Sequence, residues 1–123
     1  MRLPLIVSLC LWLAAAEVGA GEVRLLIQNS PLAGSQYYAV GDYWEQLRVG
    51  DPLQLTREPD NRHDPYAIRV EWRGHQLGYV PRANNRALAA ALDAGECLTA
   101  RIAELNRHPD PWRRVRFEVF VGL

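Results

Sequence analysis

The chain has 123 residues, of which 49% are hydrophobic and 23% charged, and this is the composition of one folded globular domain. Its 14 basic residues, all arginine, balance 14 acidic residues, so the formal net charge is +0. A neutral molecule has no overall positive field that would hold a polyanion. Composition therefore excludes a disordered or fibrous protein, and any nucleic-acid binding must come from a local site.

The first twenty residues have the pattern of a secretory signal peptide. Arg2 precedes an uncharged, largely apolar run at residues 3–16, and small residues at 18–20 come before the polar pair Gly21-Glu22. The run is shorter than the roughly 20 apolar residues that span a bilayer. We therefore expect residues 1–20 to be removed on export, which leaves a periplasmic or secreted chain without stable membrane insertion. An uncleaved membrane anchor is the alternative.

Residues 22–123 form the expected mature domain, and their apolar residues recur mostly with a period of two. This period is typical of strands that bury one face. Arg73-Gly74 is a turn signal that joins two of these strands as a hairpin. The prolines of the His108-Pro109-Asp110-Pro111 segment predict a loop before the final strand. Alternation thus predicts six short strands, at residues 23–27, 53–55, 68–72, 75–80, 98–102 and 115–121.

One clear helix is expected between the fourth and fifth strands. Pro81 precedes an alanine- and leucine-rich segment at residues 83–94, and Gly95 provides a stop. A shorter helical turn is expected at residues 42–48. Six short strands with one or two short helices predict a mainly β domain, folded as a strongly curved sheet or a partly open barrel.

The densest polar segment lies between two predicted strands, and it reads Arg57-Glu58-Pro59-Asp60-Asn61-Arg62-His63-Asp64-Pro65. Two prolines fix φ, and Asp60, Asn61 and Asp64 can accept hydrogen bonds from backbone amides, so one interpretation is a rigid, self-bonded turn. The other is a binding loop, because a stiff loop that carries an amide and a carboxylate can orient a ligand hydroxyl.

Two further segments carry candidate residues. Tyr37 and Tyr38 are expected on opposite faces of an extended segment, with Tyr38 in the core and Tyr37 facing outward. Gly78, next to Tyr79, permits close approach of another backbone. Arg82 falls in the first turn of the expected helix, where a phosphate can bind. A solvated surface charge is the alternative for Arg82.

In their order and spacing these clusters resemble the HIRAN domain, a module attached to helicase-like ATPases and also found in stand-alone bacterial proteins. The specific part is the run Arg-Glu-Pro-Asp-Asn-x-x-Asp-x-x-Ala-Ile at residues 57–68. The resemblance implies a small OB-like barrel of about six strands. Further matching residues are Gly34, Tyr37-Tyr38, Val49-Gly50-Asp51, Leu53, Leu55, Val70 and Gly78-Tyr79-Val80-Pro81.

The resemblance also implies a function: a non-enzymatic module that captures the 3′ end of single-stranded DNA, or a similar anionic ligand with a free hydroxyl. It implies that Tyr37 contacts the terminal nucleotide, that Asn61 and Asp64 recognise its 3′-hydroxyl, and that His63 stacks. The implied ligand-binding set is completed by Tyr79 and Arg82, with supporting residues Tyr38, Arg57, Asp60 and Arg62.

Three positions differ from the DNA-binding relatives. Gln36 stands where they have an arginine, His63 replaces a tyrosine, and Pro81-Arg82 replaces a lysine pair. The first change removes a charged contact to phosphate.

Two other functions stay open. A metal-dependent hydrolase or nuclease would use Asp60, His63, Asp64 and His75 to hold zinc or magnesium, although no HExxH or paired-cysteine motif is present and no cofactor is expected. An envelope adaptor would bind a protein or a glycan through exposed tyrosines and tryptophans. The chain has no glycine-rich phosphate loop, and this excludes ATPase activity.

Overall fold

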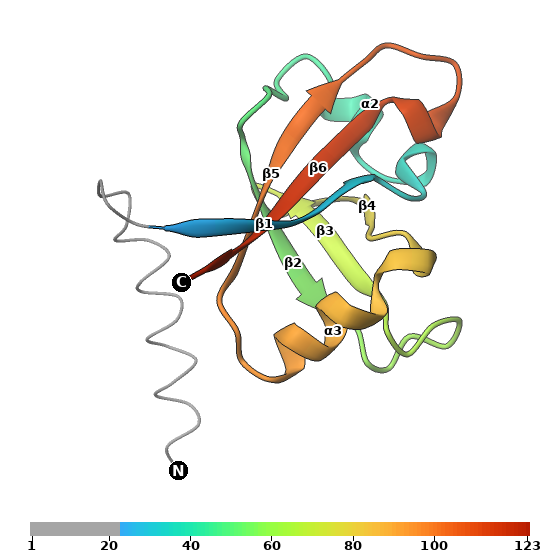
Figure 1. The fold of residues 1–123 in the computed structure, drawn as a ribbon. Helices are drawn as coiled ribbons and strands as arrows, with labels where there is room; N and C mark the ends of the chain where they lie inside the picture. Colours follow the sequence, from blue (N-terminus) through green and yellow to red (C-terminus); the bar gives the residue numbers. More distant parts are fainter. Residues whose placement is uncertain (1–22) are drawn as a thin grey trace.

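The computed structural model describes residues 23–123, so the expected signal peptide lies outside the described residues. One six-stranded antiparallel sheet dominates the fold, and its strand order is β1-β6-β5-β2-β3-β4 (Figure 1). The strands are β1 (Arg24–Pro31), β2 (Pro52–Arg57), β3 (Ile68–Trp72), β4 (His75–Tyr79), β5 (Leu98–Leu105) and β6 (Val115–Gly122).

The sheet curls until its two outer strands, β1 and β4, almost meet. A single antiparallel bridge joins them, in which Ala33, just after β1, and Tyr79 exchange two backbone hydrogen bonds of 2.9 Å. Gly78 makes this approach possible, because a Cβ at that position would lie 2.4 Å from the Ala33 carbonyl oxygen. The expected mainly β, OB-like and partly open barrel is confirmed.

Short helices cover the ends of the barrel. The helix expected at residues 83–94 is divided into the 3-10 turn η2 (Arg82–Asn84) and α3 (Arg86–Asp93), which packs against β2 (Figure 1). Gly95 ends α3 with φ 84°, and its amide donates to the Leu92 carbonyl. The remaining elements are η1 (Ser35–Tyr37), α2 (Val40–Tyr43) and η3 (Pro111–Arg113).

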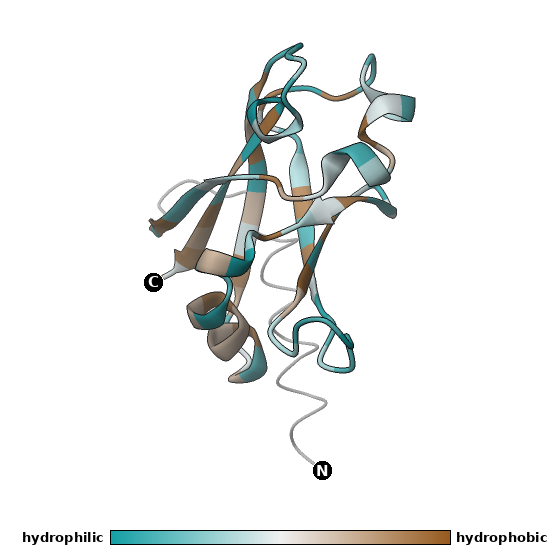
Figure 2. Ribbon diagram, turned by 90° about the vertical axis from the view of Figure 1, so that its right-hand side faces the viewer, coloured by the Kyte–Doolittle hydropathy of each residue, from teal (hydrophilic) through white to brown (hydrophobic). Residues whose placement is uncertain are grey.

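The core lies between the curled sheet and these helices. Strands β3, β5 and β6 alternate buried and more exposed positions, which Figure 2 shows as apolar and polar segments along each strand. Ile68, Ile102 and Phe117 are completely buried, and Leu88 and Ala89 of α3 close one end. Within residues 23–123, no helix is both long enough and apolar enough to cross a membrane.

Two expectations about burial are wrong. Leu25 and Ile27 of β1 are 52% and 42% exposed, because β1 is an edge strand whose first half extends past the core (Figure 1). Tyr37 and Tyr38 do not lie on a strand, so they do not alternate between faces. Residues 35–37 form the turn η1; Tyr37 faces outward as expected, at 78% exposed, but Tyr38 is also exposed, at 39%, and does not enter the core.

Candidate nucleic-acid interface

The polar loop between β2 and β3 is bonded to itself through Asn61. The Asn61 Oδ1 atom accepts hydrogen bonds from the backbone amides of His63 (2.8 Å) and Asp64 (3.1 Å). Its Nδ2 atom donates to Glu58 Oε1 at 3.0 Å. The loop is hydrophilic along its length (Figure 2), and these bonds give it one conformation without a buried apolar residue.

Asp64 joins this loop to the helical side of the barrel. Its Oδ1 atom accepts from the Tyr66 amide at 2.9 Å, and its Oδ2 atom accepts from Asn85 Nδ2 at 2.8 Å. Asn85 is itself only 2% exposed. Burial acts to raise the pKa of Asp64, but these hydrogen bonds and the charges of Arg82 and Arg57 outweigh it, so the pKa is lowered. Asp64 is therefore an ionised carboxylate at neutral pH.

A pocket of about 400 Å³ opens beside Asp64. Arg82 lies on its rim: its Nη2 atom donates to the His63 carbonyl at 2.9 Å, its Nε atom lies 3.9 Å from Asp64 Oδ2, and its side chain is 75% exposed. The Arg86 guanidinium lies 4.6 Å from the centre of the Tyr66 ring. The pocket thus combines one carboxylate with two guanidinium groups; Pro65, Ala83 and Asn85 complete its lining.

Glu58 connects the loop to the tyrosines. Its Oε1 atom accepts from the Tyr79 hydroxyl at 2.8 Å as well as from Asn61, and its Oε2 atom accepts from Arg69 Nη1 at 3.1 Å. Burial and the nearby Glu58 carboxylate raise the pKa of Tyr79. Tyr38 packs against the Tyr79 ring, edge to face, with 5.8 Å between ring centres. Tyr79 therefore supports the loop from β4, and Tyr38 packs behind it.

The structure brings together only part of the candidate set. Asn61, Asp64, Arg82 and Tyr79 belong to one continuous network of hydrogen bonds and ion pairs, together with Glu58. Tyr37 lies apart from these bonds, as an exposed ring on η1. The other exposed candidates, on the outer side of the loop, are Asp60, Arg62 and His63.

Arg57 does not line the pocket, and it ties β2 to α3. Its guanidinium donates to both carboxylate oxygens of Asp93, at 2.9 and 3.2 Å, and to the Ala67 carbonyl at 3.0 Å. Its role is to hold the helix against the sheet. Within residues 23–123, Asp60, His63 and Asp64 do not form a metal-binding group, and no other three His, Cys, Asp or Glu side chains do so.

Sequence reasoning missed three pocket residues: Tyr66, Asn85 and Arg86. In the sequence, strands β3 and β4 separate Asn85 and Arg86 from the loop, and only the fold brings these two residues to Asp64. The one available signal was Asn85 itself, a polar residue that interrupts an alanine- and leucine-rich helix pattern.

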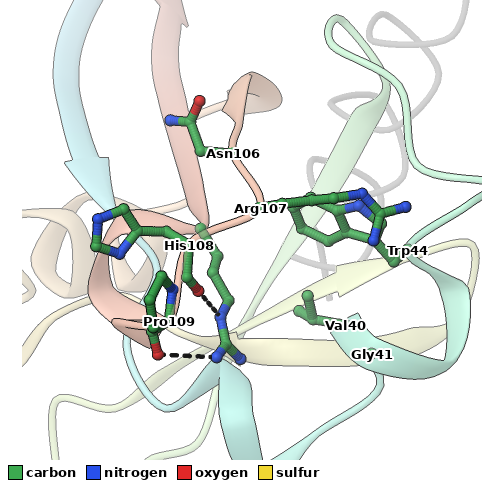
Figure 3. A pocket seen from close by; sticks show the side chains of 8 residues that line it. Val40, Gly41, Trp44, Asn106, Arg107, His108 and Pro109 are labelled. Carbon is green, nitrogen blue, oxygen red and sulfur yellow. Dashed lines mark hydrogen bonds between the residues drawn. The ribbon is translucent and has the colours of Figure 1, made fainter.

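A second hollow, of about 410 Å³, lies at the other end of the barrel between α2 and the β5–β6 connection (Figure 3). Arg114 donates to the carbonyls of His108 and Pro109 at 2.7 and 3.0 Å and fixes this connection. The Arg107 guanidinium lies 5.6 Å from the centre of the Trp44 ring, so the arginine itself covers the exposed side of the indole. The Arg114 and Arg107 guanidinium groups of this hollow therefore already contact other groups of the protein.

Comparisons with known proteins agree with the fold. The chain is similar to a Lactobacillus plantarum protein of known crystal structure, with 26% identity and a TM-score of 0.70 over 83% of this chain and 98% of that one. The HIRAN domain of human HLTF shares the fold, with 20% identity and a TM-score of 0.60 over 85% of this chain and 83% of that one.

A curated relative and a family model give the sequence relationship. The relative is a Fanconi-associated nuclease 1 homolog from Oryza sativa subsp. japonica, 40% identical over an alignment of 52 residues that covers 39% of this chain but only 5% of that protein. The model of the HIRAN domain matches residues 26–123, nearly the whole described structure. The chain therefore belongs to the HIRAN domain family.

Proposed function

We propose that this domain is a non-enzymatic DNA-binding module that holds the 3′ end of a single strand in the pocket beside Asp64. Membership of the HIRAN family supports DNA as the ligand, since HIRAN domains bind DNA. The chain also resembles part of a protein named as a nuclease.

The observation that carries the proposal is an ionised carboxylate in a pocket with two guanidinium groups. Oδ1 of Asp64 accepts one hydrogen bond from the Tyr66 amide, Oδ2 accepts one from Asn85, and each oxygen keeps a second lone pair. An ionised carboxylate accepts a bond from a terminal hydroxyl but repels a terminal phosphate. Arg82 and Arg86 line the same pocket, and this supports a proposed pairing with the phosphate one step inward along the strand.

The exposed ring of Tyr37 supplies a stacking surface outside this pocket. Stacking of a base on an aromatic side chain contributes about 1 to 3 kcal/mol whatever the base, so it adds affinity without sequence preference. The neutral chain and the uncharged Gln36 limit the number of phosphate contacts. We therefore propose weak binding with a shallow dependence on salt concentration.

Fluorescence anisotropy with three labelled oligonucleotides tests the proposal. The oligonucleotides have the same sequence and end in a 3′-hydroxyl, a 3′-hydrogen or a 3′-phosphate. Loss of one hydrogen bond to a charged group costs about 1.5 to 3 kcal/mol, so we expect the 3′-hydroxyl end to bind at least about tenfold more tightly than the other two. Equal affinity for all three ends would refute recognition of the end.

A further inference from the structure

Trp112 is a large aromatic side chain that the fold leaves open. It is 50% exposed, whereas tryptophan is highly buried on average. Asp110, the residue before η3, fixes the backbone at Trp112. Its Oδ1 atom accepts from the Trp112 amide at 3.0 Å, and its carbonyl accepts from the Arg113 amide at 3.0 Å. The ring is thus presented by a capped turn rather than by a loose loop.

Trp112 borders a hollow of about 340 Å³ on the outer side of β5 and β6. Arg113, whose side chain is 70% exposed, and Arg116 also line it, together with the carboxylate of Glu104. The Arg113 Nε atom lies 3.9 Å from Asp110 Oδ2, a carboxylate outside this lining. Arg116 is held in place because its Nε atom donates to Asn29 Oδ1 at 3.0 Å. An open indole face beside two guanidinium groups has the chemistry that receives a stacked base and its phosphate.

The turn that carries Trp112 is joined to the turn that carries Tyr37. Ser35, only 2% exposed, donates from its Oγ atom to the Pro111 carbonyl at 3.4 Å, and η1 and η3 pack together there. Tyr37 lies two residues after Ser35, and Trp112 follows Pro111 directly. Two exposed aromatic rings from distant parts of the sequence are therefore held on neighbouring turns.

We infer that Trp112 forms a second subsite for an unpaired nucleotide of the same strand. The base stacks on the indole, and Arg113 and Arg116 pair with its phosphate. The inference rests on the proposed function: a strand whose 3′ end lies beside Asp64 runs past Tyr37 and reaches Trp112 with a nucleotide further from the end.

The test uses two lengths of oligothymidylate, a trinucleotide and a ten-nucleotide strand, each with a 3′-hydroxyl or a 3′-phosphate end. For the unaltered domain we expect the longer strand to bind about tenfold more tightly, because it alone reaches Trp112. The change of end should lower affinity by the same factor at both lengths, since the two subsites act independently.

Trp112→Leu should abolish the gain from length but keep the end preference, whereas Trp112→Phe should keep both, because only phenylalanine retains an aromatic face. Arg113→Gln, remote from the core, should lower the slope of log affinity against log salt by about one for the longer strand. Circular dichroism melts confirm that each variant is folded.

An unchanged gain from length in Trp112→Leu and in Arg113→Gln overturns the inference. A gain from length without any end preference overturns the proposed function and leaves the subsite at Trp112.

Discussion

Asp64 has a structural role and the ligand-binding role proposed above, and both use the same two oxygen atoms. Its bonds to the Tyr66 amide and to Asn85 fix the loop, and its remaining lone pairs face the pocket. Because the side chain is only 15% exposed, the loop holds the carboxylate in position before a ligand arrives. The self-bonded turn and the binding loop are therefore compatible interpretations of this segment.

The lowered pKa of Asp64 predicts how stability depends on pH. A carboxyl group whose pKa is lower in the folded chain contributes stability above its ordinary value of 3.8, and this contribution is lost as pH falls through the folded value. Urea unfolding should show the original domain more stable than Asp64→Asn at about pH 6, with the difference shrinking below about pH 4. A difference that stays constant across this range would mean that the charge of Asp64 contributes nothing.

Individual residues of the loop could be predicted from the sequence, but their partners could not. Asn61 and Asp64 stand out because an amide and a carboxylate lie between two prolines in the segment that joins two strands. Two strands, β3 and β4, separate Asn85 and Arg86 from Asp64 in the sequence, and no periodicity of the sequence links them to it. The outward position of Tyr37 was predicted, but the exposure of Tyr38 was not, because η1 breaks the alternation of a strand.

At the scale of elements, the bridge between the edges of the sheet depends on Gly78. Gly78→Ala places a Cβ 2.4 Å from the Ala33 carbonyl oxygen, so the backbone must move and we expect a loss of about 1 to 3 kcal/mol of stability. Gly41→Ala is the matched control, because no atom lies within 4 Å of its added Cβ in α2. Thermal melts should show an unchanged or higher midpoint for the control; a Gly78→Ala midpoint equal to it would contradict the close approach.

The elements themselves were largely predictable. Alternating apolar residues indicate all six strands, since β3, β5 and β6 each bury alternate positions in one core. The helix at residues 83–94 was predicted as one piece, but Asn85 turns inward to bond Asp64 and divides it. The prediction that β1 buries one face was wrong, because alternation shows which residues share a face and does not show whether another layer covers that face.

At the scale of the whole molecule, a domain without net charge must bind DNA through local groups of charged residues. Thirteen of the 14 arginines lie in the described residues, and several are committed to structural pairs. Arg57 binds Asp93, and Arg101 binds Glu118. Arg82, Arg86 and Arg113 are exposed beside the two proposed subsites. The affinity for DNA thus depends on a few placed charges rather than on the field of the whole chain.

Export remains a prediction from residues 1–20. If these residues are a signal peptide, the chain recovered from the periplasm or the culture medium should begin at Gly21 or within a few residues of it. N-terminal sequencing or intact mass measurement checks this. Full-length chain in the cytoplasmic fraction would contradict export, and cleaved chain outside the cytoplasm would require a ligand available there.

The most direct test of the central claim compares how two loop variants distinguish DNA ends. Asp64→Asn keeps the size of the side chain but replaces one acceptor oxygen with an amide donor, whereas Asp60→Asn makes the same change at an exposed position of the same loop. The measured quantity is the ratio of affinities for 3′-hydroxyl and 3′-hydrogen oligonucleotides. Recognition by Asp64 predicts a ratio near one for Asp64→Asn and an unchanged ratio of about tenfold for Asp60→Asn. A folded Asp64→Asn domain that keeps the full ratio would contradict the claim.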